Sequence, residues 1–341
     1  MARGQRATTV NARSSSPIIG VVGFGVTGSR VVGHLVAQQV PVAVYDPDRG
    51  PGVRRRAVVV LDSVDDLTVC DVVVLCQPAP HAEVARLLVG HGTSVVSISD
   101  DLDDLRSLLD LSPAAEAHDA SVVVGAGMAP GLSGLLARLL AAQLHVVDEL
   151  HVATHGTAGP ACARQHHRAL GDTALGWHDN EWIEPPGGSG RDLVWFPEPI
   201  GAHDCYRAAM ADPLLMQRAF PQAGRITARM SATRRDRFTA RLPMLTPPHA
   251  SGNLGAVRVE ARGAGPQGER ITLIAGAAGH TGDLAAAVCA ATALRLTQME
   301  VPAGVHAVGD DVVHALDLLH HATVLGVRVQ EFTGVARATS W

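Results

Sequence analysis

The fold of this chain is limited above all by a series of short runs of consecutive aliphatic residues. Segments with a helical spacing of apolar residues separate these runs. The runs lie at residues 17–22, 40–45, 57–61, 71–76, 94–99 and 121–124. Continuous Val and Ile, rather than alternating apolar and polar residues, is typical of strands buried on both faces of a parallel sheet. Strands that alternate with helices favour right-handed crossovers. The first half of the chain is therefore predicted to form a doubly wound α/β domain.

A glycine-rich loop joins the first run to the first predicted helix. It consists of Gly23, Phe24, Gly25, Val26, Thr27 and Gly28, which fit the pattern G-x-G-x-x-G. In this pattern the first glycine permits a tight turn, the second lets the backbone approach a pyrophosphate, and the third allows close packing of helix and strand. The helix N-terminus offers free N–H groups and the positive end of its dipole to phosphates. The loop thus predicts a Rossmann domain that binds a dinucleotide.

Asp46, which ends the second predicted strand, indicates which dinucleotide this is. Its carboxylate is placed to accept hydrogen bonds from both ribose hydroxyls, and its charge would repel a 2′-phosphate. This favours NAD. Arg49 and the arginines at 54–56 follow closely in the sequence, so NADP remains the alternative.

Three further loops follow the fourth, fifth and sixth runs, and a parallel sheet presents its ligand at the carboxyl ends of its strands. We expect the nicotinamide where these loops converge. The candidate cofactor-binding residues in them are Cys76, Gln77, Pro78, His81, Ser97, Ser99, Gly127, Met128 and Pro130. The loop that contains the last three, GAGMAPG at residues 125–131, is not expected to bind phosphate, because its proline interrupts the N–H donors. It is expected to form the nicotinamide-side wall and the exit to a second domain.

After about residue 148 the pattern changes to segments typical of antiparallel strands, at residues 150–155, 193–196, 225–230, 257–262 and 270–275. The last two segments are predicted to form a hairpin. Helices over 283–299 and 311–324 and a strand over 327–332 complete the chain. The length of 341 residues also favours two domains, because single cores rarely grow much beyond ~300 residues. The predicted fold class is a Rossmann doubly wound parallel sheet plus a second α+β domain with a mixed or antiparallel sheet.

Composition excludes several functions. All 28 basic residues are arginine, so the chain cannot form a lysine Schiff base or use lysine as a general acid or base. The net charge of −5 gives no case for nucleic-acid binding, and no apolar stretch is long enough to span a membrane. The five cysteines are scattered without C-x-x-C pairs, which favours reduced thiols and a cytoplasmic location.

Parts of the chain resemble the saccharopine dehydrogenase (reductase) family, which includes lysine 6-dehydrogenase and carboxynorspermidine synthase. The matching segments are GFGVTG at 23–28, PAPHAEVARLLVGHGTSVVSISDD at 78–101 and above all GAGMAPGLSGLLA at 125–137. The hairpin VRVEARG…ERITLIAG and the TG-initiated helix after it are similar to the later portion of the family. Residues 155–245 depart from the family pattern, and these are the residues that would select the substrate.

The resemblance implies a Rossmann domain completed in part by the C-terminal helices, and an α+β domain that binds substrate and dimerises. The implied boundaries are a disordered tail at 1–16 (a transit peptide being the alternative), the NAD(P)-binding domain at 17–147, the substrate and dimerisation domain at 148–280, and a C-terminal part at 281–341 that packs back on the Rossmann domain. The implied activity is NAD(P)-linked oxidoreduction, with hydride transfer at an amine or imine carbon of a small molecule, either an amino acid or an amine-derived substrate. By match of motif, Gly23, Gly25, Gly28 and Asp46 would hold the adenosine diphosphate, and Pro78, Ser99, Gly127 and Pro130 would surround the nicotinamide and its ribose.

The proton donor or acceptor must be sought among histidine and acidic residues, since lysine is absent. His155 ends the first strand of the second domain, where the two domains are expected to face each other, and His151 lies on the same face of that strand. Asp100 closes the fifth run at the predicted cleft. These three residues are the catalytic candidates.

No metal site is expected, because the doublets 166–167 and 320–321 place adjacent histidines about 100° apart on a helix. Two other functions remain open. They are a dehydrogenase that acts on an alcohol or aldehyde carbon and a non-catalytic dinucleotide-binding sensor, because a Rossmann domain alone does not fix the acceptor.

Overall fold

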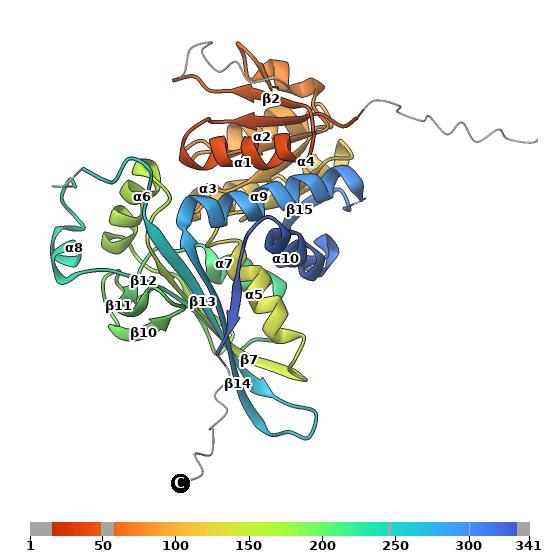
Figure 1. Cartoon of the computed structure of the whole chain (residues 1–341). Coiled ribbons are helices and arrows are strands. Elements are labelled where there is room, and N and C mark those ends of the chain that lie inside the picture. Colours follow the sequence, from red (N-terminus) through yellow and green to blue (C-terminus); the bar gives the residue numbers. More distant parts are fainter. Residues whose placement is uncertain (1–15, 49–57, 245–246, 300, 333–341) are drawn as a thin grey trace, which may run out of the picture.

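The computed structural model describes residues 16–48, 58–244, 247–299 and 301–332, which form two sheets (Figure 1). The first has seven parallel strands in the order β15-β6-β5-β4-β1-β2-β3. Their bounds are β1 Ile19–Val22, β2 Val42–Tyr45, β3 Val58–Val60, β4 Val72–Leu75, β5 Ser94–Ser97, β6 Ser121–Val124 and β15 Gly304–Ala307. The order 3-2-1-4-5-6 is that of dinucleotide-binding domains, and it confirms the doubly wound parallel sheet.

Helices cover both faces of this sheet. One face packs against α1 (Val26–Ala37), α5 (Leu132–Ala141) and α9 (Thr281–Gln298). The other packs against α2 (Ala82–Val89), α3 (Leu102–Leu109) and α4 (Ser112–Ala117), with the short helix η1 (Asp65–Val69) beside them. The strands β1, β4 and β6 are buried along their whole length, which is why their sequences are continuous apolar runs.

The second sheet has nine strands and is mixed, as predicted. Its order is β10-β11-β12-β7-β13-β14-β16, with β8 and β9 attached beside β12. The bounds are β7 Val146–His155, β8 Gly176–His178, β9 Glu181–Ile183, β10 Asp192–Phe196, β11 Gly201–Arg207, β12 Arg225–Ser231, β13 Leu254–Ala264, β14 Arg270–His280 and β16 Val329–Glu331. The predicted β13–β14 hairpin is present, and β12 and β7 form a parallel pair. The remaining helices are α6 (Pro160–Gly171), α7 (Asp212–Ala219), α8 (Arg234–Thr239), η2 (Asp311–Val313) and α10 (Ala315–Val324).

The C-terminal part of the chain divides between the two sheets. Helix α9 lies between the N-terminal domain and the second sheet (Figure 1) and packs against α1 and β4. Strand β15 extends the parallel sheet beside β6, whereas β16 pairs with β14 in the second sheet. The expectation that the last strand packs on the Rossmann domain is therefore wrong. Its backbone groups pair with the exposed edge of the hairpin instead.

No described helix is both long and apolar enough to cross a membrane. The expected tail at 1–16 lies outside the described residues except for Ser16.

Candidate active site

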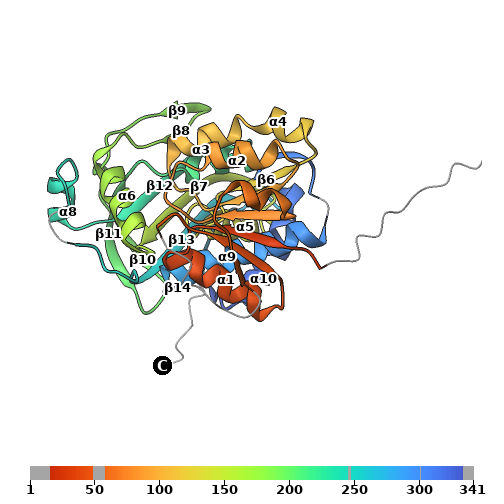
Figure 2. The same ribbon diagram turned by 90° about the horizontal axis from the view of Figure 1, so that it is seen from above.

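A cavity of about 1150 Å³ lies at the carboxyl edge of the parallel sheet, between this edge and helix α6. It extends without interruption from the glycine loop and Asp46, past the loops after β4, β5 and β6, to the side chains of α6. Figure 2, which looks down on the N-terminal domain, shows α6 beside this domain and near α3. The amide of Gln165 on α6 donates a hydrogen bond of 2.9 Å to Asp101 at the start of α3. The two domains thus share one cavity.

The three motif glycines meet three different spatial demands. Gly23 has φ +88°, and a Cβ on it would lie 2.6 Å from the backbone nitrogen of Gln77. A Cβ on Gly28 would lie 1.9 Å from the carbonyl oxygen of Gly23, so strand and helix pack too closely for a side chain. A Cβ on Gly25 would meet nothing within 4 Å, although this residue lines the cavity. The open space at Gly25, in front of the N-terminus of α1, fits a diphosphate.

Asp46 lies beside this loop and lines the cavity. Its carboxylate accepts hydrogen bonds from the backbone N–H of Phe24 at 2.6 Å and of Asp48 at 2.9 Å. These bonds hold the end of β2 against the glycine loop, so the acid stands where the ribose of a dinucleotide would lie. The side chain of Phe24 is buried in the core. Arg49, named for the same region, lies outside the described residues.

The middle of the cavity contains buried polar atoms without a partner. Oε1 of Gln77, Oγ of Ser99 and Oγ1 of Thr154 are buried and make no hydrogen bond, and all three residues line the cavity. Such atoms are costly unless a ligand or water satisfies them. Together with the open space at Gly25, they show that the residues present fit a bound dinucleotide. Cys76, Pro78, Gly127 and Met128 line the same region, as the sequence predicts.

His81 and Ser97 lie behind this wall and do not line the cavity. The ring of His81 places Nδ1 2.8 Å from Oγ of Ser97 and Nε2 2.8 Å from the carbonyl oxygen of Gln77. The carboxylate of Asp104 accepts the backbone N–H groups of His81 and Ala82. Burial lowers the pKa of His81, so the ring is neutral. Both residues support the loop at 76–80 rather than contacting a cofactor, which corrects the sequence prediction.

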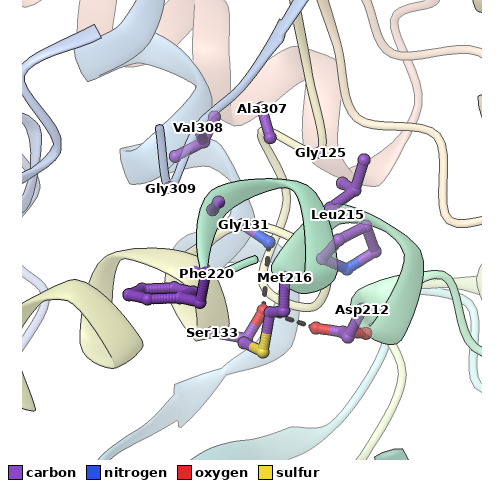
Figure 3. Close-up of a pocket in the computed structure, with 13 residues that line it drawn as sticks. Gly125, Gly131, Ser133, Asp212, Leu215, Met216, Phe220, Ala307, Val308 and Gly309 are labelled. Carbon is purple, nitrogen blue, oxygen red and sulfur yellow. Dashed lines mark hydrogen bonds between the residues drawn. The ribbon is translucent and has the colours of Figure 1, made fainter. Parts of the chain in front are cut away.

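The loop at 125–133 separates two spaces. Gly127 and Met128 face the large cavity, whereas Pro130 and Gly131 line a separate cavity of about 20 Å³ against α7 (Figure 3). Gly131 cannot carry a side chain, since a Cβ would lie 2.1 Å from the carbonyl oxygen of Gly127. Because Pro130 lines this small cavity and not the large one, it is not positioned to contact a cofactor. Only the side of the loop that carries Gly127 and Met128 forms the expected wall.

His151 and His155 are not brought to the cavity. Side chains alternate across a strand, so Thr154 faces the cavity while His151 and His155 point to the opposite face of the second sheet. There Nδ1 of His155 lies 2.8 Å from Oγ of Ser231 and the ring stacks on His203. His151 contacts Thr227 and Glu149. The two histidines do lie on one face of one strand, as predicted. In the structure, however, this face points away from the cavity, so the prediction that they line the cleft is wrong.

Asp100, the third catalytic candidate, does line the cavity, and it meets two residues of α6. Its Oδ2 lies 3.5 Å from Nε2 of His166, and the same nitrogen lies 3.6 Å from Sγ of Cys162. Burial disfavours a charged ring, but attraction to the Cys162 sulfur and the Asp100 carboxylate raises the pKa of His166 well above its usual value. These three residues form the polar centre at the far end of the cavity.

One feature of the sequence indicates this centre, although the histidine doublets on which the expectation of no metal site rested do not show it. Cys162 and His166 are four residues apart, so they lie on one face of α6, whereas His167 points elsewhere and contacts the carbonyl oxygen of Leu242. Arg164 and Arg168 of the same helix also line the cavity. No local pattern shows that this face of α6 meets the end of β5.

No model of a protein family matches the chain, and no curated protein matches its sequence. Many solved structures are similar to it, among them two dehydrogenases. Saccharopine dehydrogenase (L-Glu forming) from Saccharomyces cerevisiae superimposes with a TM-score of 0.67 at 14% identity, covering 93% of this chain and all of the yeast chain. A mutant meso-DAP dehydrogenase with DAP from Clostridium tetani gives a TM-score of 0.50 at 15% identity over 85% of this chain and 93% of its own. The resemblance seen in the sequence is confirmed at the level of the fold: the chain has the fold of saccharopine dehydrogenase.

Proposed function

We propose that the protein is an NAD(P)-dependent oxidoreductase that acts on the amine or imine carbon of an amino acid or a related small molecule. The observation that carries the proposal is the single cavity that joins a dinucleotide-type glycine loop to a polar centre on α6. A similar fold in saccharopine dehydrogenase and in a meso-DAP dehydrogenase supports it.

Gly25, the N-terminus of α1 and Asp46 would hold the adenosine half of the cofactor. Gln77, Ser99 and Thr154 carry the buried polar atoms without partners that would receive the nicotinamide half. When bound, the nicotinamide accepts or supplies the hydride.

The polar side chains at the α6 end of the cavity favour a substrate that carries both a carboxylate and an amine. Arg164 and Arg168 line the cavity, and neither forms an ion pair with an acid within the described part of the chain. They are available to bind a carboxylate, which arginine does in a bidentate manner. Asp100 brings a carboxylate to the polar centre, and carboxylate oxygens accept hydrogen bonds from the N–H groups of an amine. An amino acid offers both a carboxylate and such N–H groups.

The first test is a titration with NADH and NADPH, followed by nucleotide fluorescence and thermal shift. Loss of a charged hydrogen-bond acceptor typically costs about 1.5–3 kcal/mol, so we expect Asp46→Ala to weaken NADH binding about 10- to 100-fold. Asp110→Ala, which removes an exposed acid at the end of α3, is the matched control and should bind as wild type. If wild type binds neither nucleotide, the proposal is wrong.

The substrate class is tested by screening amino acids and simple amines for NAD(P)⁺-dependent oxidation. Replacing Arg164 and Arg168 by Gln should raise KM for amino acids at least 10-fold and leave KM for amines without a carboxylate nearly unchanged. Arg270→Gln, far from the cavity and paired with Asp148, serves as control. Equal effects on both kinds of substrate would exclude carboxylate binding by these arginines.

A further inference from the structure

We propose that Asp100, Cys162 and His166 form a binding site for a divalent metal ion of the zinc class, with its open side toward the cavity. The geometry of the three residues supports the site directly. Only its catalytic role rests on the proposed function.

The distances fit a metal site. One ligand atom from each residue lies within 4.8 Å of the other two, and the contacts to Nε2 of His166 are 3.5 and 3.6 Å. With Zn–S bonds of about 2.3 Å and Zn–N or Zn–O bonds of about 2.0 Å, a tetrahedral site separates its ligand atoms by roughly 3.3–3.6 Å. The two contacts to Nε2 of His166 therefore already have the length of tetrahedral edges, and the Asp100 oxygen and the Cys162 sulfur lie within 4.8 Å of each other.

Hydrogen bonding accounts for the same contacts less well. Asp100 and Cys162 both approach Nε2, which carries at most one proton and cannot donate fully to both. A separation of 3.5 Å between nitrogen and oxygen also exceeds the usual length of about 2.7–3.2 Å. A nucleophilic Cys–His–Asp triad would place the acid and the thiol on different ring nitrogens. A cation between the three atoms satisfies all of them at once.

The donor set and its support match a catalytic zinc site. Sulfur, imidazole nitrogen and carboxylate oxygen are the ligands that zinc takes, and three protein ligands leave one position free. Cys162 and His166 are held on one face of α6, and Asp100 follows β5. The hydrogen bond from Gln165 to Asp101 fixes the helix against this loop. Ligands from two anchored elements thus converge without a change of fold.

All three residues line the cavity, so the free position faces the space where a substrate would lie. There the metal would bind the nitrogen or oxygen attached to the reacting carbon. In reduction, the reduced nicotinamide would supply hydride to this carbon and become oxidised, the π electron pair of C=N or C=O would move onto the heteroatom, and water would give it a proton and leave as hydroxide. The chain has no lysine ammonium for this electrophilic role.

The test is metal binding measured without turnover. Protein stripped with a chelator is titrated with Zn²⁺ and Co²⁺, the bound metal is quantified by elemental analysis, and the cobalt spectrum is recorded. We expect one ion per chain, with the visible bands of tetrahedral cobalt and a thiolate-to-cobalt charge-transfer band. Cys162→Ser should abolish the charge-transfer band, and His166→Gln and Asp100→Asn should each weaken affinity at least 10-fold. His167→Gln, on the same helix but directed away from the site, is the matched control and should bind metal as wild type.

Circular dichroism and NADH binding in the same samples separate the outcomes. A folded protein that binds NADH but retains no stoichiometric metal overturns the metal site and leaves the proposed function intact. Stoichiometric metal without nucleotide binding supports the site and overturns the proposed function. Full binding by folded Cys162→Ser and His166→Gln places the ion elsewhere and also overturns the inference.

Discussion

At the scale of single residues, the glycine loop shows how one residue type serves different purposes. Gly23 and Gly28 are required by the fold, because a side chain at either would collide with backbone atoms. Gly25 is not required by the fold, because the space beside it is empty. That space is explained by a ligand that must approach the backbone closely.

This difference predicts opposite results for two alanine substitutions. Gly28→Ala should destabilise the protein by about 3 kcal/mol, since the added methyl meets the Gly23 carbonyl and overpacking is costly. Gly25→Ala should leave the melting temperature without nucleotide unchanged and weaken NADH binding at least 10-fold. Thermal melts and NADH titrations of both variants check this. Wild-type stability in Gly28→Ala would show that helix and strand are not in close contact.

At the scale of elements, the loop between β6 and α5 is fixed from behind by α7. Oγ of Ser133 accepts the N–H of Gly131 and donates to the carboxylate of Asp212, the first residue of α7 (Figure 3). Asp212 is buried, its second oxygen has no hydrogen-bond partner, and burial raises its pKa to about 6. The loop between β6 and α5 therefore rests on a buried carboxyl group that loses its proton less readily than an exposed aspartic acid.

A raised pKa in the folded state means that stability is lost as pH rises from about 4 through 6, when the buried carboxyl ionises. Asp212→Asn keeps an acceptor for Ser133 and removes this ionisation. We expect the stability of the variant relative to wild type to increase by about 2 kcal/mol between pH 4.5 and pH 8. Urea unfolding at both pH values measures the change, with Asp110→Asn as the exposed control. A difference that does not vary with pH would contradict the buried ionisation.

At the scale of the whole molecule, the second sheet has a face toward the core and a face away from it. Leu150 and Val152 of β7 pack in the core with α5 and α9, while His151 and His155 lie on the other face. Burial first, and then the neighbouring His203, lower the pKa of His155 to about 4. Burial likewise lowers the pKa of His151. Both rings are neutral in the folded protein.

A lowered histidine pKa makes the folded protein sensitive to acid, because the unfolded chain takes up protons from pH 6.5 downward and the folded chain only near pH 4. The ring of His155 is partly solvated, which screens part of the effect of its lowered pKa. We therefore expect His155 to contribute about 1 kcal/mol to the loss of stability between pH 7 and pH 5. His155→Gln should remove this contribution, whereas His118→Gln, at an exposed position, should not. Unfolding curves at the two pH values test the expectation. An identical pH dependence in His155→Gln would contradict it.

The parallel sheet, the turn of the glycine loop and the position of Asp46 beside it could be predicted from the sequence alone. These features are local: a strand buried on both faces needs a continuous apolar run, and a tight turn against a phosphate needs glycine at fixed spacing. The mixed second sheet and its hairpin followed from alternation and turn residues in the same way.

Which side chains meet in the cavity depends on the packing of elements and could not be predicted from the sequence. His155 and Thr154 are neighbours in sequence, yet the pleat of β7 and its place in the sheet put only Thr154 at the cavity. Asp100 and His166 belong to different domains and come within 3.5 Å because α6 packs against the carboxyl edge of the parallel sheet. Such packing depends on contacts between elements far apart in the chain, and these leave no periodic trace in the sequence of either element.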